Sequence, residues 1–218
     1  MELSQARKYW KVGASIGCEG CEPFSSLFFK AFEPDETLLQ RIDGKSWKRG
    51  QSIPAEDLRY LTLPHFPGIN GDIVLGEMLC HKDIAPELLD IFQTLFNHHY
   101  PIERLRLIDD YEADDNASMA ANNSSCFCDR SVAWSSEKKS RHALGMAVDI
   151  NPLYNPMVRV RDGVLKVYPP QSLPYADRTR NFAYKIERSD LCHKLFIARG
   201  FRWGGAWASG PDYQHFEK

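Results

Sequence analysis

Two short stretches near the C-terminal end of this chain constrain its fold more than any other feature. The first, Ser140–Pro156, contains His142 and Asp149, and the second, the last eight residues, contains His215. His142 and Asp149 are seven residues apart, so a single extended strand would separate them by about 23 Å. We therefore expect a turn at Gly145, because glycine accepts backbone angles that other residues avoid.

A short strand is expected directly after that turn. From Met146 to Asn151 the sequence alternates between large apolar residues and alanine, aspartate or asparagine. This period of two is typical of a strand, here with Asp149 on its less apolar face. The Asn151-Pro152 pair then ends the strand.

His142, Asp149 and His215 offer two imidazoles and a carboxylate. This is a common ligand set for a catalytic zinc ion whose fourth position is left to water. Asp212, three residues before His215, is close enough in sequence to act on that water. From these residues alone other interpretations stay open, because seven histidines give many chance combinations. A histidine beside an apolar run is usually a core or surface residue, and Asp149 alone would serve as a turn or capping residue.

The sequence around these residues resembles the zinc peptidases of the D-Ala-D-Ala carboxypeptidase family (M15-type), which includes vancomycin-resistance dipeptidases and phage L-alanyl-D-glutamate endolysins. The family motif S-x-H-x-x-G-x-A-x-D is filled by Ser140, His142, Gly145, Ala147 and Asp149. A second motif is filled by Trp203, Gly204, Gly205, Trp207, Asp212, His215, Phe216 and Glu217. A third stretch, NNSSCFCDR ending at Arg130, is similar to a segment of one subfamily. The resemblance covers roughly residues 55–218.

The resemblance implies a metal site and an acid beside it. His142, Asp149 and His215 would bind Zn²⁺, and Asp212 would take a proton from the attacking water and pass it to the leaving amine. Glu217 is the nearby competitor for this acid role. We expect Glu217 on the other side of a strand from His215.

The resemblance also implies residues that contact the substrate. Arg130 would stabilise an oxyanion or hold a substrate carboxylate through charge-assisted hydrogen bonds; its alternative is a surface salt bridge. Asn123 and Ser125 would line the substrate cleft. Ser140 would bond the substrate backbone, or simply shape its loop.

The implied fold is α+β, with an antiparallel sheet that carries the zinc site between flanking helices, as in the hedgehog/DD-peptidase fold. The mixture of helical and hairpin patterns in this chain indicates the same class. The implied function is a zinc-dependent peptidase acting on peptidoglycan stem peptides, either as a D,D-carboxypeptidase or as an L-Ala–D-Glu type endopeptidase. The alternative is a non-catalytic zinc-stabilised domain that binds peptides or cell wall, since hedgehog domains share the metal site.

Composition excludes several other classes. With 43% hydrophobic and 12% aromatic residues, the chain is able to bury a core and is not disordered. Lys and Arg number 27 against 29 Asp and Glu, a net charge of −2, which argues against nucleic-acid binding. No apolar run approaches the roughly 20 residues of a membrane span. A cell-wall peptidase would act in the periplasm or cell envelope after removal of a leader; the alternative is a cytoplasmic protein.

Six cysteines are compatible with either compartment. Cys18 and Cys21 form a C-x-x-C pair, a weak indication of redox chemistry or metal binding, and a redox protein is a third candidate function. Cys126 and Cys128 stand where relatives more often have alanine and asparagine. This departure leaves the metal ligands untouched but puts the shape of the cleft, and hence the bond that is cut, in doubt.

The chain is expected to form one catalytic domain over residues 53–218, with residues 1–52 as an N-terminal arm packed on it. We expect strands at Leu58–Leu63, Ile73–Leu79 and Ile102–Ile108, and a loop over Asp109–Lys139. Helices are expected at Asp83–His99, capped by Asp83, and at Ser189–Arg199, capped by Ser189 and stopped by Gly200. Val158–Val167 should form a hairpin with Asp162-Gly163 as its turn.

Overall fold

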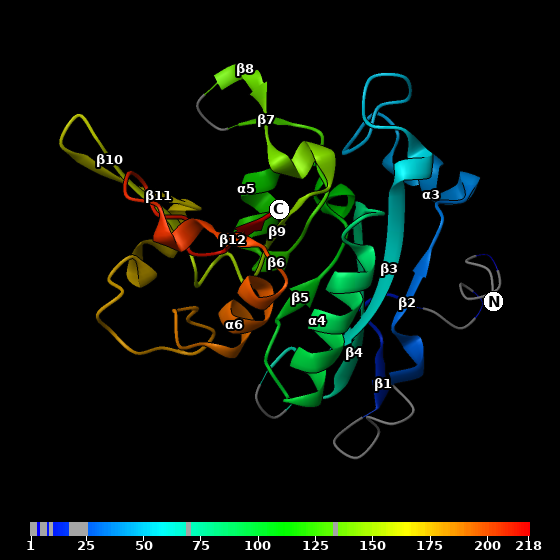
Figure 1. Ribbon diagram of the computed structural model, residues 1–218, viewed down its shortest axis with the longest axis horizontal. Coiled ribbons are helices and arrows are strands. Elements are labelled where there is room, and N and C mark those ends of the chain that lie inside the picture. Colours follow the sequence, from blue (N-terminus) through cyan, green and yellow to red (C-terminus); the bar gives the residue numbers. More distant parts are fainter. Residues whose placement is uncertain (1–3, 5–7, 9–10, 18–25, 69–70, 133–134) are drawn as a thin grey trace.

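A computed structural model of the chain describes residues 4, 8, 11–17, 26–68, 71–132 and 135–218 (Figure 1). The Cys18–Cys21 pair lies outside the described residues. The longer helices are α3 (Glu36–Ile42), α4 (Ala85–Asn97), α5 (Asp115–Ala120) and α6 (Leu191–Ala198). Short 3₁₀ segments lie at Ser26–Phe28, Ala55–Asp57, Ile108–Tyr111, Arg141–Leu144, Pro170–Tyr175 and Gly204–Ala206.

The largest sheet has four antiparallel strands in the order β1-β4-β3-β2. Its strands are β1 (Ser15–Gly17), β4 (Ile73–His81), β3 (Leu58–His65) and β2 (Lys30–Phe32). Both central strands are buried along most of their length, which explains why they read as short apolar runs in the sequence. The strands expected at Leu58–Leu63 and Ile73–Leu79 are confirmed, and each extends two residues further.

Helix α4 packs against β3 and covers one face of this sheet (Figure 1). Leu88, Ile91, Phe92, Leu95 and Phe96 are buried on its apolar side. Each such side chain contributes about 1.5–3 kcal/mol on burial, so the amphipathic pattern, rather than helix propensity, fixes this element. Helix α6 lies beside α4 and continues the same core.

Both expected helix caps were wrong by one residue. Ile84, not Asp83, occupies the N-cap of α4 and makes no side-chain cap bond. Pro86 lies in the first turn, where a missing N–H costs nothing. Asp190, not Ser189, caps α6, because its carboxylate accepts the backbone N–H two residues on at 2.9 Å. The predicted stop at Gly200 is confirmed by its φ of +81°.

A three-stranded antiparallel sheet, β12-β13-β9, forms the second layer. Its strands are β12 (Arg202–Trp203), β13 (His215–Glu217) and β9 (Ala147–Asp149). The register places His215 directly opposite Asp149. On the same sheet, Phe216 is fully buried and its ring stacks on Phe196 of α6 at 4.3 Å, which fixes β13 against the helical layer.

The expected strand at Ile102–Ile108 was wrong in its extent. Only β5 (Arg104–Leu105) is extended, and it pairs in parallel with β6 (Asn123–Ser124). The backbone N–H of Glu103 donates to the side chain of Asn151, and that of Arg106 to the side chain of Asn123. These side-chain bonds replace the strand pairing that the alternation indicated.

The expected loop at Asp109–Lys139 was also too simple. It contains a 3₁₀ turn at Ile108–Tyr111 and helix α5, as well as strands β6, β7 (Ser131–Val132) and β8 (Ser135–Lys139). Further on, the hairpin is confirmed as β10 (Met157–Arg161) and β11 (Val164–Tyr168). Asp162 and Gly163 form its turn with φ values of +52° and +73°, and the hairpin projects from the body on the side opposite α3 (Figure 1).

The architecture is α+β with mainly antiparallel sheets, as expected. Strand β2 belongs to the main sheet. Residues of β2 and of helix α3 form a second apolar cluster that includes Phe32, Leu38, Ile42 and Trp47. The division of the chain at residue 52 stays a prediction. None of the helices in the described residues is long and apolar enough to span a membrane.

The buried His65 at the end of β3 makes stability depend on pH. Its Nδ1 lies 2.6 Å from the carbonyl oxygen of Ile102, and burial lowers the pKa of His65 to about 4 despite this bond. The unfolded chain protonates near pH 6.5, so the free energy of unfolding should fall as the pH falls from 6.5 to 4, by about 3 kcal/mol at most. Urea denaturation across this range measures the slope.

The matched variant is His65→Gln, which keeps a donor for Ile102 but does not titrate. Its unfolding free energy should depend less steeply on pH over the same range. Identical slopes for the two proteins would contradict the assignment to His65.

Candidate metal centre

The turn before β9 positions the first candidate ligand. Ser140 caps the 3₁₀ turn Arg141–Leu144, where its hydroxyl accepts the backbone N–H of His142 at 3.3 Å. Gly145 ends the turn with φ +65°, so the turn expected at this glycine is confirmed. The carbonyl of Gly145 accepts the N–H of His81 at 2.9 Å, which ties the turn to the end of β4.

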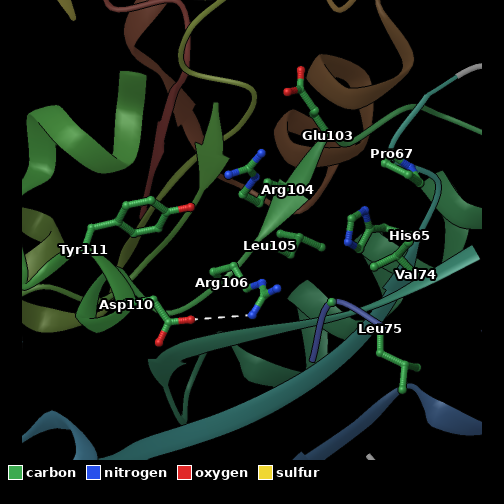
Figure 2. A pocket seen from close by; sticks show the side chains of 11 residues that line it. His65, Pro67, Val74, Leu75, Glu103, Arg104, Leu105, Arg106, Asp110 and Tyr111 are labelled. Atoms are coloured by element: carbon green, nitrogen blue, oxygen red, sulfur yellow. Dashed lines mark ion pairs between the residues drawn. The ribbon is translucent and has the colours of Figure 1, made fainter. Parts of the chain in front are cut away.

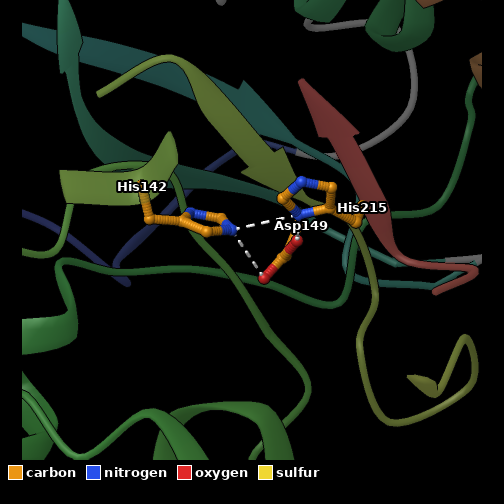
Figure 3. A group of neighbouring side chains, drawn as sticks. All are labelled: His142, Asp149 and His215. Atoms are coloured by element: carbon orange, nitrogen blue, oxygen red, sulfur yellow. Dashed lines mark hydrogen bonds and ion pairs between the residues drawn. The ribbon is translucent and has the colours of Figure 1, made fainter. Parts of the chain in front are cut away.

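His142, Asp149 and His215 converge within the second layer (Figure 3). His142 Nε2 lies 3.2 Å from Asp149 Oδ2 and 3.2 Å from His215 Nδ1. His215 Nδ1 lies 3.0 Å from Asp149 Oδ1. Each of the three residues offers one ligand atom, and these atoms all lie within 4.8 Å of one another. All three side chains are buried. The arrangement offers two ring nitrogens and a carboxylate to one ion.

Each imidazole has its outer nitrogen engaged by another part of the chain. His142 Nδ1 lies 2.6 Å from the carbonyl oxygen of Cys126, so it carries the proton and leaves Nε2 free. His215 Nε2 lies 3.4 Å from Glu217 Oε2, which favours a proton on Nε2 and leaves Nδ1 free. Such outer bonds fix the tautomer and orientation of metal-binding histidines. The free nitrogens are the two that face Asp149.

The expectation for Glu217 was wrong. Residues two apart on a strand share a face, and β13 places Glu217 on the same side as His215. Arg202 also pairs with this carboxylate at 2.7 Å. Glu217 is thus held as a hydrogen-bond acceptor for His215.

The three groups attract one another strongly. Burial opposes the charge on Asp149, but His142 and His215 outweigh it and hold the pKa of that carboxyl well below its usual range. Burial also opposes the charge on His215, yet Asp149 and Glu217 hold its pKa well above the ordinary value. The site therefore stabilises a positive charge between the two rings.

A cavity of about 960 Å³ opens beside these ligands. It is lined on one side by the turn and β13, and on the other by the hairpin β10–β11 and α5. Trp207 contributes a partly exposed ring whose centroid lies 5.3 Å from that of His215. The candidate ligands thus face a space large enough for a peptide.

Asp212 lines the same cavity. Its backbone N–H donates to the carbonyl oxygen of Gly204 at 3.0 Å, and its backbone forms an isolated antiparallel β-bridge with Met157. Side-chain atom Oδ1 is buried and has no hydrogen-bond partner among the described residues. Burial raises the pKa of Asp212 to about 7, which suits a group that exchanges protons at neutral pH.

Residues 134–218 match the protein-family model described as D-alanyl-D-alanine carboxypeptidase. Residues 134–218, which we call the peptidase segment, are thus similar to this family. The match confirms the family resemblance over residues 134–218, which contain the three candidate ligands and Asp212. Over residues 55–133 the resemblance stays a prediction. Comparisons with curated proteins and with solved structures give no match.

The peptidase segment begins after Arg130, so this arginine reaches the site from outside the matched region. Arg130 lines the metal-site cavity and forms an ion pair with Asp115 of α5, at 3.0 Å between Nη2 and Oδ2. Its Nε is buried without a hydrogen-bond partner in the described part of the chain. Burial raises the pKa of Asp115, and Arg130 opposes the shift.

The three residues expected to bind substrate lie in different surroundings. Ser140 lines the cavity, although its hydroxyl also caps His142. The side-chain amide of Asn123 bonds the backbone of Arg106 and the hydroxyl of Ser118, and Asn123 is absent from the cavity lining. Ser125 also lies outside the lining, and its backbone pairs with Asp149. A substrate role for the three stays a prediction.

Sequence reasoning missed Asp115 and the function of Glu217. Asp115 lies in the stretch Asp109–Lys139, for which the sequence predicts only a loop. Aspartate is a preferred N-cap, so Asp114 was the residue from which a helix could have been predicted here. Asp114 does cap α5. For Glu217 the signal was its spacing of two from His215.

A second cavity of about 500 Å³ lies beside β5 (Figure 2). It shares no lining residue with the metal-site cavity. Arg106 in its wall pairs with Asp110 at 3.6 Å, and Asp110 also pairs with Arg41. No group of metal-ligating side chains was found in this cavity within the described residues.

Replacement of Gly145 tests how tightly the turn is constrained. A Cβ atom there would lie 2.6 Å from the backbone nitrogen of His81. We expect Gly145→Ala to lower the free energy of unfolding by about 2–4 kcal/mol, because left-handed strain and a backbone clash add. Zinc affinity should fall about tenfold, since His142 is displaced. Urea denaturation and zinc competition titration measure both.

Gly163→Ala is the matched control. Gly163 has φ +73°, but no atom lies within 4 Å of the added methyl group. The substitution should therefore lower the free energy of unfolding by only about 1 kcal/mol and leave zinc affinity unchanged. Equal losses in the two variants would rule out a tight contact at Gly145.

Proposed function

We propose that this chain is a zinc-dependent peptidase that hydrolyses peptide bonds of bacterial peptidoglycan stem peptides. The observation that carries the proposal is the convergence of His142 Nε2, His215 Nδ1 and the Asp149 carboxylate beside a cavity that also contains Asp212. Two imidazoles and one carboxylate form a common set of protein ligands in catalytic zinc sites. The family match supports the peptidase class.

The residues present fit zinc. Both ring nitrogens that face the centre are deprotonated when the outer nitrogens carry their protons, as Cys126 and Glu217 require. Neutral imidazole and carboxylate are the forms that bind a metal. When bound, zinc supplies Lewis acidity that activates water and polarises a peptide carbonyl.

Asp212 is the proposed general base. Its unpartnered Oδ1 is free to accept a proton from the attacking water. A carboxyl whose pKa is raised to about 7 by burial also releases that proton to the leaving amine at neutral pH. Glu217 is less suited to this role, because His215 and Arg202 already bond its carboxylate.

Arg130 and its neighbours recognise the substrate in this proposal. Five cationic side chains line the cavity, namely Arg130, Lys139, Arg141, Arg159 and Arg202. Arg130 would donate to the oxygen that becomes negative during attack. Lys139 and Arg202 are already paired with Asp129 and Glu217. Arg141 is therefore the cation that we propose to attract a carboxylate of a stem peptide.

Two finer points belong to the same proposal. The three-stranded sheet that holds the ligands would correspond to the metal-site sheet of the hedgehog/DD-peptidase fold. A peptidase for peptidoglycan would act in the periplasm or cell envelope. Both a D,D-carboxypeptidase and an L-Ala–D-Glu type endopeptidase are compatible with a cavity of this size.

Metal analysis combined with digestion of purified peptidoglycan tests the function. We expect about one zinc per chain and release of D-Ala or of stem peptides, detected by mass spectrometry. A chelator should abolish the release and added zinc should restore it. Bound zinc without cleavage of any wall substrate would favour the non-catalytic binding domain instead.

The role of Asp212 is tested by Asp212→Ala. The variant should retain zinc, because the three ligands are untouched, while kcat falls at least ~100-fold through loss of the proton acceptor. Asp83→Ala removes an exposed carboxylate far from the ligand residues in sequence and should leave both quantities unchanged. Full activity of Asp212→Ala would refute the assignment.

A further inference from the structure

The ion pair between Asp115 and Arg130 is a distinct part of the metal-site cavity. Its two side chains are about equally exposed, Arg130 at 26% and Asp115 at 27%, and both line the cavity. Arg130 uses Nη2 for this contact, and its Nε is buried without a hydrogen-bond partner in the described part of the chain. The guanidinium is therefore held from one side by Asp115 while it borders the cavity.

Helix α5 holds Asp115 in place. Asp114, not Asp115, provides the cap, because its carboxylate accepts the N–H groups of Asn116 and Ala117. The helix is anchored underneath by the buried Ser118 and Met119, and Ser118 bonds Asn123 at 3.0 Å. Asp115 thus starts the helix with a carboxylate that is not needed for capping and meets Arg130.

A single fixed carboxylate has a large effect on an arginine. The free side chain samples many rotamers, and restricting them costs up to about 2 kcal/mol. A contact to one Nη narrows the set of rotamers that the guanidinium samples, so its donors are partly oriented before any substrate arrives. Preorganised donors contribute most where negative charge develops during the reaction.

We propose that Asp115 is a positioning residue, which holds the Arg130 guanidinium so that the part of it that borders the cavity donates to the carbonyl oxygen of the substrate beside the metal ligands. The proposal rests on the proposed peptidase function and deepens it. Asp115 itself does not touch the reacting atoms. Its carboxylate acts through Arg130 alone.

Asp115→Asn, Arg130→Gln and the double variant test this role with zinc-loaded protein and the stem peptide that the wild type cleaves. We expect Asp115→Asn to lower kcat about 10–100-fold, because a misdirected donor costs rates of this order, with KM changed less than about threefold. In the double variant kcat should be no lower than in Arg130→Gln, since Asp115 has no role without the guanidinium. Asp115→Glu should recover part of the loss.

Asp114→Asn is the matched control, because it removes the same charge one residue away and asparagine caps helices as well as aspartate. It should retain wild-type kcat. Zinc content and the unfolding midpoint should be the same in all variants. Wild-type kcat in Asp115→Asn, or losses that multiply in the double variant, would overturn the positioning role.

A separate readout distinguishes failure of this proposal from failure of the proposed function. If the zinc-loaded wild type cleaves no wall substrate, the function is refuted, and the pair is then tested by binding of a phosphinate dipeptide, a mimic of the tetrahedral transition state. Binding at least tenfold weaker in Asp115→Asn than in wild type supports the positioning role. Equal affinity, or no binding by the wild type, overturns it.

Discussion

Asp149 is the residue on which the whole site depends. Its backbone exchanges two hydrogen bonds with Ser125, and its cross-strand neighbour on β13 is His215. Its carboxylate faces both His142 and His215 at 3.0–3.2 Å. One residue thus joins a segment before the turn, the turn and the C-terminal strand. Loss of the strand pairing would separate the two histidines, because they are 73 residues apart and no local structure holds them together.

The first part of the chain contributes to the site at a distance. Ser46 bonds the buried Asp109 through its N–H and its hydroxyl, and its carbonyl accepts the N–H of Asp129 at 2.8 Å. Ser52 also bonds the Asp129 carboxylate. These contacts hold both ends of the segment that contains α5 and precedes Arg130. The peptidase segment supplies the candidate ligands and Asp212, whereas Arg130 and Asp115 in the cavity lining come from outside that match.

The features visible in the sequence were those encoded locally. Gly145 and the short alternation after it indicated the turn and strand around Asp149, and the apolar spacing of α4 indicated its helix. The sequence did not reveal the contact of Asp115 with Arg130, because it depends on how α5 packs. The strand expected at Ile102–Ile108 is shorter because two of its backbone N–H groups donate to the side-chain oxygens of distant asparagines. Periodicity describes burial, and it does not show which side chains occupy the backbone donors.

The two unusual cysteines are accounted for by burial rather than by chemistry. Cys126 presents its backbone carbonyl to His142 and its thiol to the carbonyl of Gly145, so any residue with a small buried side chain preserves the bond that orients the imidazole. Burial raises the pKa of both thiols, that of Cys128 to about 12. A neutral thiol is a poor nucleophile and a poor metal ligand. Neither residue lines the cavity, so both cysteines lie behind the candidate ligands as buried packing residues.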